Sequence, residues 1–125
     1  MPAASAIARS SSRQLCPHPA KASFSASAKW ASMTSRFAGF GVEHIAITRD
    51  SEPIIAHAQG QTSEVPVMAV KPVDTLGAGD IFHGAFCHYI LEYDFLLSLE
   101  RAGEVASLSC TSLGTRAWIE QEKFL

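Results

Sequence analysis

One stretch, residues 73–86, constrains the fold of this chain more than any other; it reads Val-Asp-Thr-Leu-Gly-Ala-Gly-Asp-Ile-Phe-His-Gly-Ala-Phe. A short apolar segment leads into the small-residue turn Gly77-Ala78-Gly79, and an amphipathic helix follows the turn. The first N–H groups of a helix have no partner within the helix, and the helix dipole is positive at that end. Because the turn carries almost no side chain, other atoms can approach these N–H groups closely. The turn therefore predicts a binding site for an anion, above all for phosphate.

A carboxylate, Asp80, directly follows this turn. Donors for a developing negative charge beside a group that can accept a proton are the minimal equipment for phosphoryl transfer to an alcohol. Taken alone, the same residues have a structural interpretation, because an Asp at the start of a helix is an ordinary N-cap and Gly-x-Gly turns are common. The four residues by themselves leave both interpretations open.

The longer pattern Asp-Thr-Leu-Gly-Ala-Gly-Asp-x-Phe-x-Gly-Ala-Phe closely resembles the C-terminal signature of the ribokinase-like (phosphofructokinase-B type) carbohydrate kinases. This resemblance implies ATP-dependent phosphoryl transfer to a sugar hydroxyl. It implies that Asp80 is the catalytic base and that Gly77, Ala78 and Gly79 form the anion hole.

Two residues upstream of the turn, Asp74 and Thr75, match family positions that help to shape the nucleotide and monovalent-cation region. The resemblance therefore implies ATP and a small sugar as partners, with Mg²⁺ and K⁺ as the accompanying cations, and leaves a homodimer open as the assembly. The sequence does not name the sugar.

The order of the elements predicts an α/β fold, the C-terminal part of a ribokinase-like (Rossmann-like) sandwich with about three strands followed by two helices. Apolar runs predict strands over residues 43–48 and 54–58, joined as a hairpin, and an extended segment over residues 65–73; residues 60–63 are interpreted as a polar turn. Helical periodicity predicts helices over about residues 80–93 and 96–113. Gly84 costs the first helix up to ~1 kcal/mol, which predicts close packing of that helix against the sheet.

Thr48 is a second predicted nucleotide-site residue. Its segment resembles the family strand that ends in Thr-x-Gly-x-x-Gly beside the phosphates, but Asp50 and Pro53 stand where glycines are usual. Asp50 would place a like charge near the phosphates, and Arg49 would offset it. A plain hairpin turn is the alternative, because Asp, Ser and Pro are ordinary turn formers.

Gly114 also has two interpretations. It is a plausible stop for the second helix, and residues 112–114 resemble, over a short stretch, the small-residue segment that flanks the adenine and cation region in the family.

The first 37 residues differ from the rest of the chain. Nine serines and nine alanines fall within residues 1–36, and the first acidic residue is Glu43. This composition predicts a disordered extension over residues 1–37, interpreted as a transit peptide, a disordered tail or sequence from a faulty gene model. Residues 38–125 form the predicted partial kinase domain. The expected location is a plastid or the cytoplasm.

Composition narrows the function classes further. The formal net charge of −2 gives no indication of nucleic-acid binding, and no apolar run approaches the ~20 residues that span a bilayer. Cys16, Cys87 and Cys110 fit no metal spacing, so no metal site is predicted. Cys87 and Cys110 fall in helical patterns, which predicts buried reduced thiols and favours a reducing compartment.

Two absences support an alternative function. The sequence contains no asparagine, so the family's Asn-x-x-Glu motif, associated with organising Mg²⁺, is absent. The N-terminal part that carries the sugar contacts in the family has no counterpart in these 125 residues. The alternative is therefore a truncated, non-catalytic nucleotide-binding or regulatory fragment of such a kinase.

Overall fold

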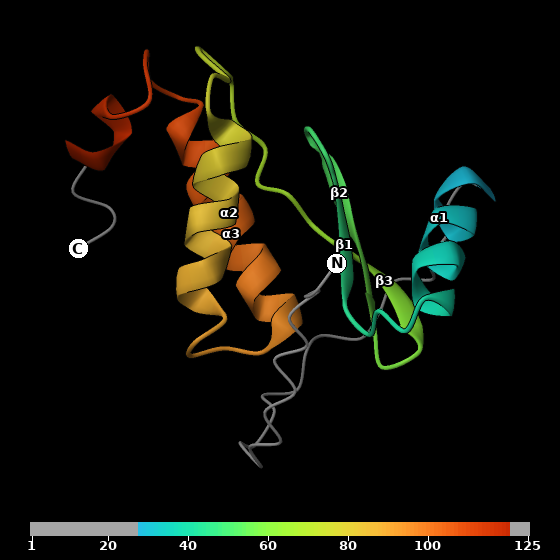
Figure 1. Cartoon of the computed structure of the whole chain (residues 1–125). Helices are drawn as coiled ribbons and strands as arrows, with labels where there is room; N and C mark the ends of the chain where they lie inside the picture. The colour runs from blue at the N-terminus through green and yellow to red at the C-terminus, as the bar shows by residue number, and fades with distance from the viewer. Residues whose placement is uncertain (1–27, 121–125) are drawn as a thin grey trace.

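The computed structural model describes residues 28–120, and predictions that concern residues 1–27 and 121–125 lie outside the described residues. The elements in chain order are α1 (Ala28–Gly39), β1 (Ile45–Arg49), β2 (Glu52–Ala58), β3 (Gln61–Val65), α2 (Ala78–Tyr89), α3 (Phe95–Ser109) and the 3₁₀ helix η1 (Ala117–Glu120). Figure 1 shows the sheet between α1 and the pair of helices α2 and α3. The α/β class, with three strands followed by two helices, is confirmed.

The predicted N-terminal extension is helical where the structure describes it. Residues 28–37 belong to α1, whose Thr34 side chain is buried and donates to the carbonyl oxygens of Ala31 and Trp30. The earlier part of the extension lies outside the described residues. An ordered helix therefore precedes the expected boundary at residue 38.

The sheet is an antiparallel meander in the order β1-β2-β3. In the predicted first hairpin, which is confirmed, Ile47 lies opposite Ile55 and Ala46 lies opposite Ala56. The second hairpin turns through Gln59 and Gly60, both at positive φ, in a two-residue loop that matches the twist of its strands.

The prediction for the third strand was wrong. β3 is formed by Gln61–Val65, which includes the residues interpreted as a polar turn, and residues 66–73 form no strand. The tight loop at Gln59 and Gly60 brings the polar segment alongside β2, and backbone pairing does not require apolar side chains. The prolines at 66 and 72 cannot donate ladder hydrogen bonds, which is consistent with an unpaired segment there.

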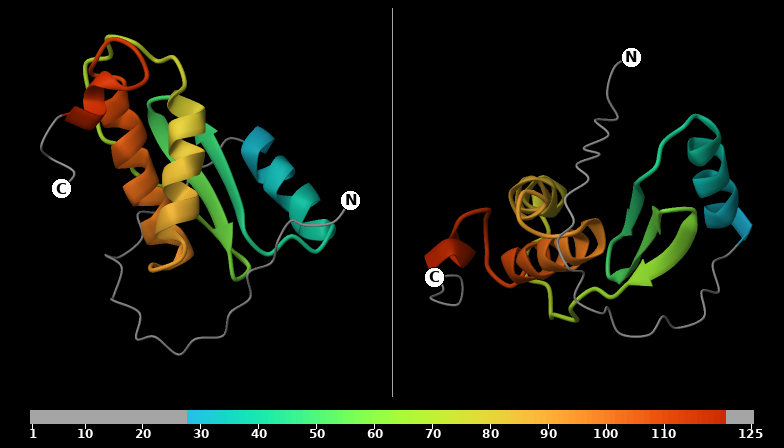
Figure 2. Two further views of the ribbon diagram at one scale, coloured as in Figure 1. Left: turned by 60° about the vertical axis from the view of Figure 1, so that its left-hand side comes forward. Right: turned by 90° about the horizontal axis from the view of Figure 1, so that it is seen from below.

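Helices cover the two faces of the sheet differently, with α1 on one face and the α2–α3 pair on the other (Figure 2). The core cluster lies on the second face and joins the sheet to α3 through Ile54, Ala56, Val65 and Leu99, all at most 2% exposed. Phe82 and Phe86 of α2 pack against this cluster. Each fully buried aliphatic side chain contributes about 1.5–3 kcal/mol, so this cluster fixes where the two helices stand.

The structure corrects two further expectations, that Gly114 ends the second helix and that Gly84 marks close packing of the first. α3 ends at Ser109 with Cys110 as its C-cap, so Gly114 is not the stop of this helix. In α2, a Cβ built on Gly84 meets no atom within 4 Å, so close packing does not explain this glycine among the described residues. α2 packs on α3 on one side and none of its residues is fully buried. Within residues 28–120, no helix has both the length and the apolar character needed to cross a membrane.

Candidate functional site at the turn before α2

The turn that precedes α2 is a β-turn over residues 75–78. The N–H of Ala78 donates to the carbonyl oxygen of Thr75 at 3.2 Å, and Gly77 takes φ 76° and ψ 4°. These angles belong to the third position of a type II turn, which favours glycine because a Cβ is strained at positive φ. Gly77 is also the N-cap of α2, so the turn delivers the chain directly into the helix.

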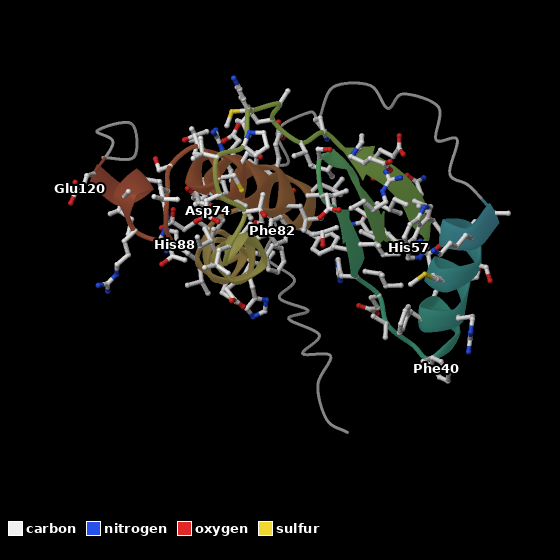
Figure 3. All side chains as sticks on the ribbon, turned by 90° about the horizontal axis from the view of Figure 1, so that it is seen from above. Phe40, His57, Asp74, Phe82, His88 and Glu120 are labelled. Atoms are coloured by element: carbon white, nitrogen blue, oxygen red, sulfur yellow. The ribbon has the colours of Figure 1, made fainter. Side chains whose placement is uncertain are left out.

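Asp74 ties this turn to a distant segment of the chain. Its Oδ1 accepts from the N–H of Leu76 and its Oδ2 accepts from the N–H of Gly114, both at 2.9 Å. The backbone N–H groups of Val73 and Asp74 donate to the carbonyl oxygen of Cys110 at 2.7 and 3.2 Å. Figure 3 shows Asp74 beside the N-terminal end of α2. The turn is thereby fixed to the segment that follows α3.

The same two hydrogen bonds lower the pKa of Asp74. The bond from Leu76 has the largest effect and the bond from Gly114 the next, while partial burial acts in the opposite direction. Both N–H groups stabilise the ionised carboxylate more than the protonated one, because each hydrogen bond weakens when the Asp74 oxygen loses its negative charge. Asp74 therefore holds the turn in place, and the part in the nucleotide and cation region that the family resemblance implies for it stays a prediction.

The fit between the turn and the segment after α3 is close. A Cβ placed on Gly77 would lie 3.2 Å from Cγ2 of Thr115. Gly114 itself takes φ 79°, and its N–H points to Asp74. Gly77 thus serves both a positive φ and a close approach at this junction, whereas Gly114 serves a positive φ alone, since a Cβ there would meet no atom within 4 Å.

The three N–H groups that were predicted to bind an anion differ in whether they already have a hydrogen-bond partner. The N–H of Ala78 is used inside the turn, whereas the N–H groups of Gly77 and Gly79 have no hydrogen-bond partner among the described residues. Two of the three predicted donors are therefore open at the positive end of a twelve-residue helix. Open backbone donors at such an end suit an anion, which is the fit expected for a nucleotide phosphate.

Asp80 is the third residue of α2 and its side chain is exposed. It is not the N-cap, because that position belongs to Gly77, so the ordinary capping interpretation of Asp80 is wrong. The carboxylate lies in the first turn, where the helix dipole favours negative charge. Its role as a base stays a prediction.

Thr48 lies near the end of β1, at the same end of the molecule as the N-terminus of α2 (Figure 1). The adjacent Arg49 donates to Glu52 at 2.9 Å, to Glu64 at 3.2 Å and to the carbonyl oxygen of Pro53. Its guanidinium is thus engaged by the β1–β2 hairpin and by β3, as the plain-turn interpretation expects. Within residues 28–120 no hydrogen bond or ion pair links Thr48 or Thr75 to an open amide of the turn. That Thr48 and Thr75 contribute to a nucleotide site therefore stays a prediction.

Sequence reasoning missed the far side of this junction. The carbonyl of Cys110 and the side chain of Thr115 gave no local signal, and only Gly114 was marked as an unusual residue. Cys110 is a buried free thiol as expected, but Cys87 is exposed, because α2 is covered on one side alone. The Sγ of Cys87 lies 3.7 Å from Nε2 of His83, one helical turn away.

Among the residues that the structure describes, no group of three or more His, Cys, Asp or Glu side chains could hold a metal ion. Two pockets in this part of the chain are lined by α1, β1 and the hairpin that follows, and neither includes the turn or Asp80. At the junction itself, Gly79 and Asp80 are exposed at the surface.

Residues 17–122 match the sequence profile described as pfkB family carbohydrate kinase. The chain belongs to this family. Fructosamine kinase FrlD of Bacillus subtilis (strain 168) is 30% identical to it over 107 residues, which cover 82% of this chain and 38% of that protein. Mouse ribokinase is 36% identical over 75 residues, which cover 58% of this chain and 23% of the ribokinase. The pfkB chain thus spans well under half the length of these curated relatives.

Solved structures agree with this family assignment. A putative ribokinase II of E. coli, crystallised with ATP and Mg²⁺, is similar to this chain with a TM-score of 0.62 and 26% identity. The likeness covers 68% of this chain and 28% of the E. coli chain. The structural neighbours therefore share the ribokinase fold with this pfkB chain, over its matched part.

Proposed function

We propose that this chain carries the catalytic-base and phosphate-donor part of a carbohydrate kinase, which transfers the γ-phosphoryl group of ATP to a sugar hydroxyl. The observation that carries the proposal is the pair of open amides at Gly77 and Gly79, in the same first turn of α2 as Asp80. Membership of the pfkB family and the similarity to a kinase crystallised with ATP and Mg²⁺ support it.

The proposed chemistry assigns one task to each residue. Asp80 accepts the proton of the sugar hydroxyl as its oxygen bonds to the γ-phosphorus, and the bond from that phosphorus to the β–γ bridging oxygen breaks to release ADP. The N–H groups of Gly77 and Gly79 donate to phosphoryl oxygens, where negative charge is concentrated. Asp74 does not react; it holds the turn that aims these amides.

Mg²⁺ neutralises phosphate charge when it accompanies a nucleotide. The described residues offer no cluster that could hold it, so the proposal includes no step that depends on a resident metal. K⁺ remains an expectation from the family resemblance, tested by replacing K⁺ with Na⁺ in the assay below. The nature of the sugar also stays open; the relatives' names suggest ribose, deoxyribose and fructosamine as first substrates for the assay.

The test uses the full chain of 125 residues. ATP is titrated into the protein by calorimetry, and ADP release is measured with the panel of sugars. We expect Asp80→Asn to keep ATP affinity while any turnover falls by about 10²–10⁴-fold, the typical range for loss of a general base. Glu92→Gln, at an exposed carboxylate that follows the C-terminal end of α2, is the matched control and should leave turnover unchanged. Turnover that survives in Asp80→Asn would show that Asp80 is not the base.

A second function is a non-catalytic nucleotide-binding fragment. It is favoured by the limited coverage of the relatives, 38% for the fructosamine kinase, and by the exposure of Asp80. Catalysis needs the hydroxyl held against its base, and this positioning is worth several kcal/mol, about 7–11 in well-oriented intramolecular reactions. ATP binding without ADP release for any sugar would support this second function.

A further inference from the structure

The exposed side of α2 carries two side chains of the types that bind metal ions. α2 packs on α3 on one side alone, and His83 and Cys87 both lie on the exposed side. The two residues are four positions apart, a spacing that places both side chains on one face of a helix. Two histidines at this spacing bind Zn²⁺ in the metalloproteases that carry a His-Glu-x-x-His helix. The spacing of the cysteines to one another gives no indication of this pair.

The two ligand atoms lie at the separation that one ion requires. Sγ of Cys87 is 3.7 Å from Nε2 of His83. In a tetrahedral Zn²⁺ site the metal binds sulfur at about 2.3 Å and nitrogen at about 2.0–2.1 Å, so the two ligand atoms lie about 3.6 Å apart. One ion can therefore bind both atoms while the side chains stay close to their present positions.

The surroundings of the pair leave space for an ion with bound water. Gly84 follows His83 and is also exposed, and a Cβ built on it meets no atom within 4 Å. Among the described residues, no third His, Cys, Asp or Glu side chain completes a group around the pair. Water therefore has to supply the remaining ligands, as it supplies the open position of a catalytic Zn²⁺ site.

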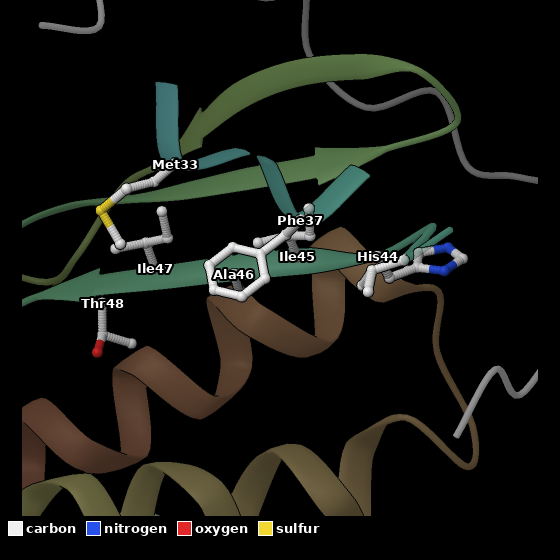
Figure 4. A pocket seen from close by; sticks show the side chains of 8 residues that line it. Met33, Phe37, His44, Ile45, Ala46, Ile47 and Thr48 are labelled. Carbon is white, nitrogen blue, oxygen red and sulfur yellow. The ribbon is translucent and has the colours of Figure 1, made fainter. Parts of the chain in front are cut away.

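The histidines outside α2 have different partners. The ring of His44 packs against Phe95 with the centroids 4.9 Å apart, beside the pocket between α1 and β1 (Figure 4). Nδ1 of His57 lies 2.9 Å from the hydroxyl oxygen of Thr62. Cys110, the other thiol in this part of the chain, is buried. Within residues 28–120, the pair on α2 is thus the accessible place where a thiol and an imidazole meet.

We propose that His83 and Cys87 form a binding site for Zn²⁺ on the exposed side of α2. Cys87 releases its thiol proton to the buffer and binds through sulfur, His83 binds through Nε2, and water completes the coordination. A thiolate with an imidazole selects Zn²⁺ over Mg²⁺, which prefers oxygen ligands. The site is therefore distinct from any site for the Mg²⁺ that accompanies a nucleotide. The ion joins two successive turns of the helix that carries Asp80.

The test uses the full chain, freed of metal with a chelator and kept reduced with a phosphine. Zn²⁺ is titrated into the protein by calorimetry. Co²⁺ is the spectroscopic probe, because a cobalt–thiolate bond gives a charge-transfer absorption in the near ultraviolet. We expect Zn²⁺ to bind, Co²⁺ to give the thiolate absorption, and an excess of Mg²⁺ to displace neither ion.

Variants of the two ligands identify the site. Cys87→Ser should remove the cobalt–thiolate absorption, and both Cys87→Ser and His83→Gln should lower the Zn²⁺ affinity at least tenfold, because even the groups that orient a ligand are worth about 10–100-fold in affinity. His88→Gln is the matched control: His88 is exposed on the same helix, but it is adjacent to Cys87 and adjacent residues do not face each other. Cys16→Ser is the control for another thiol. Both controls should keep the affinity.

Thermal unfolding separates a metal site from a plain hydrogen bond between the two side chains. Zn²⁺ should raise the unfolding midpoint of the wild type and of His88→Gln, because an ion that binds the folded chain stabilises it, and should leave the midpoint of Cys87→Ser unchanged. No Zn²⁺ binding by the wild type, equal affinity in Cys87→Ser, or one ion shared by two chains in sedimentation velocity would overturn the proposal. None of these measurements needs ATP, so the result is independent of the proposed kinase activity.

Discussion

Two turns lie at the same end of this molecule and use their polar groups in opposite ways. The β1–β2 turn is fastened by its own side chain Arg49, which bonds to Glu52 and the carbonyl of Pro53 beside the turn and to Glu64 of the neighbouring strand β3. The turn before α2 is held from outside by Asp74, and its amides at Gly77 and Gly79 are left without partners in the described part of the chain. A turn that satisfies its own groups stabilises the fold, whereas one held by a neighbour can present donors to a ligand.

The contrast also explains why the two turns differ in composition. The β1–β2 turn places Asp50 at φ 51°, which an Asp tolerates because its short polar side chain can bond locally. The turn before α2 uses Gly77 at φ 76°, where a Cβ would lie 3.2 Å from Cγ2 of Thr115. Both turns contact a distant segment, but the β1–β2 turn does so through the long side chain of Arg49 and the turn before α2 through its backbone.

The largest expected effect comes from the Asp74 clamp, the pair of hydrogen bonds that the Asp74 carboxylate accepts from the N–H groups of Leu76 and Gly114. Asp74→Ala removes the acceptor of two backbone donors, so the turn should loosen and lose its contact with the segment at Gly114. Hydrogen exchange should become faster at the amides of Leu76 and Gly114, and the unfolding midpoint should fall. The amides of the β1–β2 turn are the internal control. Unchanged exchange at Gly114 would contradict the clamp.

The clamp also predicts a pH dependence. The folded-state pKa of Asp74 is lowered, so its contribution to stability is present above the ordinary value of 3.8 and is lost as pH falls through the lower folded value. The stability difference between the wild type and Asp74→Asn should therefore be constant near neutral pH and shrink in this acid range. Chemical denaturation across pH 2–7 measures it. A stability difference between the wild type and Asp74→Asn that grows as the pH falls would contradict a lowered pKa of Asp74.

Gly77→Ala ranks next and separates the turn's two constraints. Placing a Cβ at positive φ costs about 1–2 kcal/mol, and the contact with Thr115 at 3.2 Å should add to this. Gly60→Ala is the matched control, because Gly60 has φ 73° with no atom within 4 Å of a Cβ. Denaturant unfolding should show the larger loss for Gly77→Ala. Equal losses would mean that the Thr115 contact relaxes freely.

Arg49→Met tests the self-contained turn. The Arg49 side chain is only 13% exposed and pairs with two carboxylates, so we expect its loss to cost about 1 kcal/mol. Arg101→Met removes the half-exposed pair with Glu104 and should cost less. Both variants are compared by urea unfolding at low and high salt. A larger cost for Arg101→Met would reverse our comparison of the two arginines.

The smallest expected effect is a gain in the free energy of unfolding. Gly84→Ala should stabilise the isolated chain by about 0.5–1 kcal/mol, because alanine favours the helix interior and no atom lies within 4 Å of the new Cβ. Gly103→Ala in α3 is the comparison, because its Cβ would lie 3.8 Å from Cδ1 of Ile54 in the buried core. Thermal unfolding that shows destabilisation by Gly84→Ala would indicate a contact on the exposed side of α2.

Local rules were sufficient for the turn and for the starts of the two helices, although they placed the ends of both helices too late, at about residues 93 and 113 in place of 89 and 109. The Gly-Ala-Gly segment, the start of α2 near Asp80 and the N-cap at Asp94 depend on residues within four positions of one another. The same rules gave the β1–β2 hairpin. They placed the third strand wrongly, because Gln61–Val65 pairs through its backbone and carries little apolar pattern of its own.

The sequence by itself determined that a glycine turn with unpaired amides opens α2, because the sterics of positive φ and the unpaired amides of a helix start are properties of neighbouring residues. Only the tertiary structure decided how the turn is held and which amides stay open. Oδ2 of Asp74 finds its donor at Gly114, forty residues along the chain, where the core cluster brings the end of α3. No spacing rule links those two residues, so their contact exists only once α3 packs on the sheet.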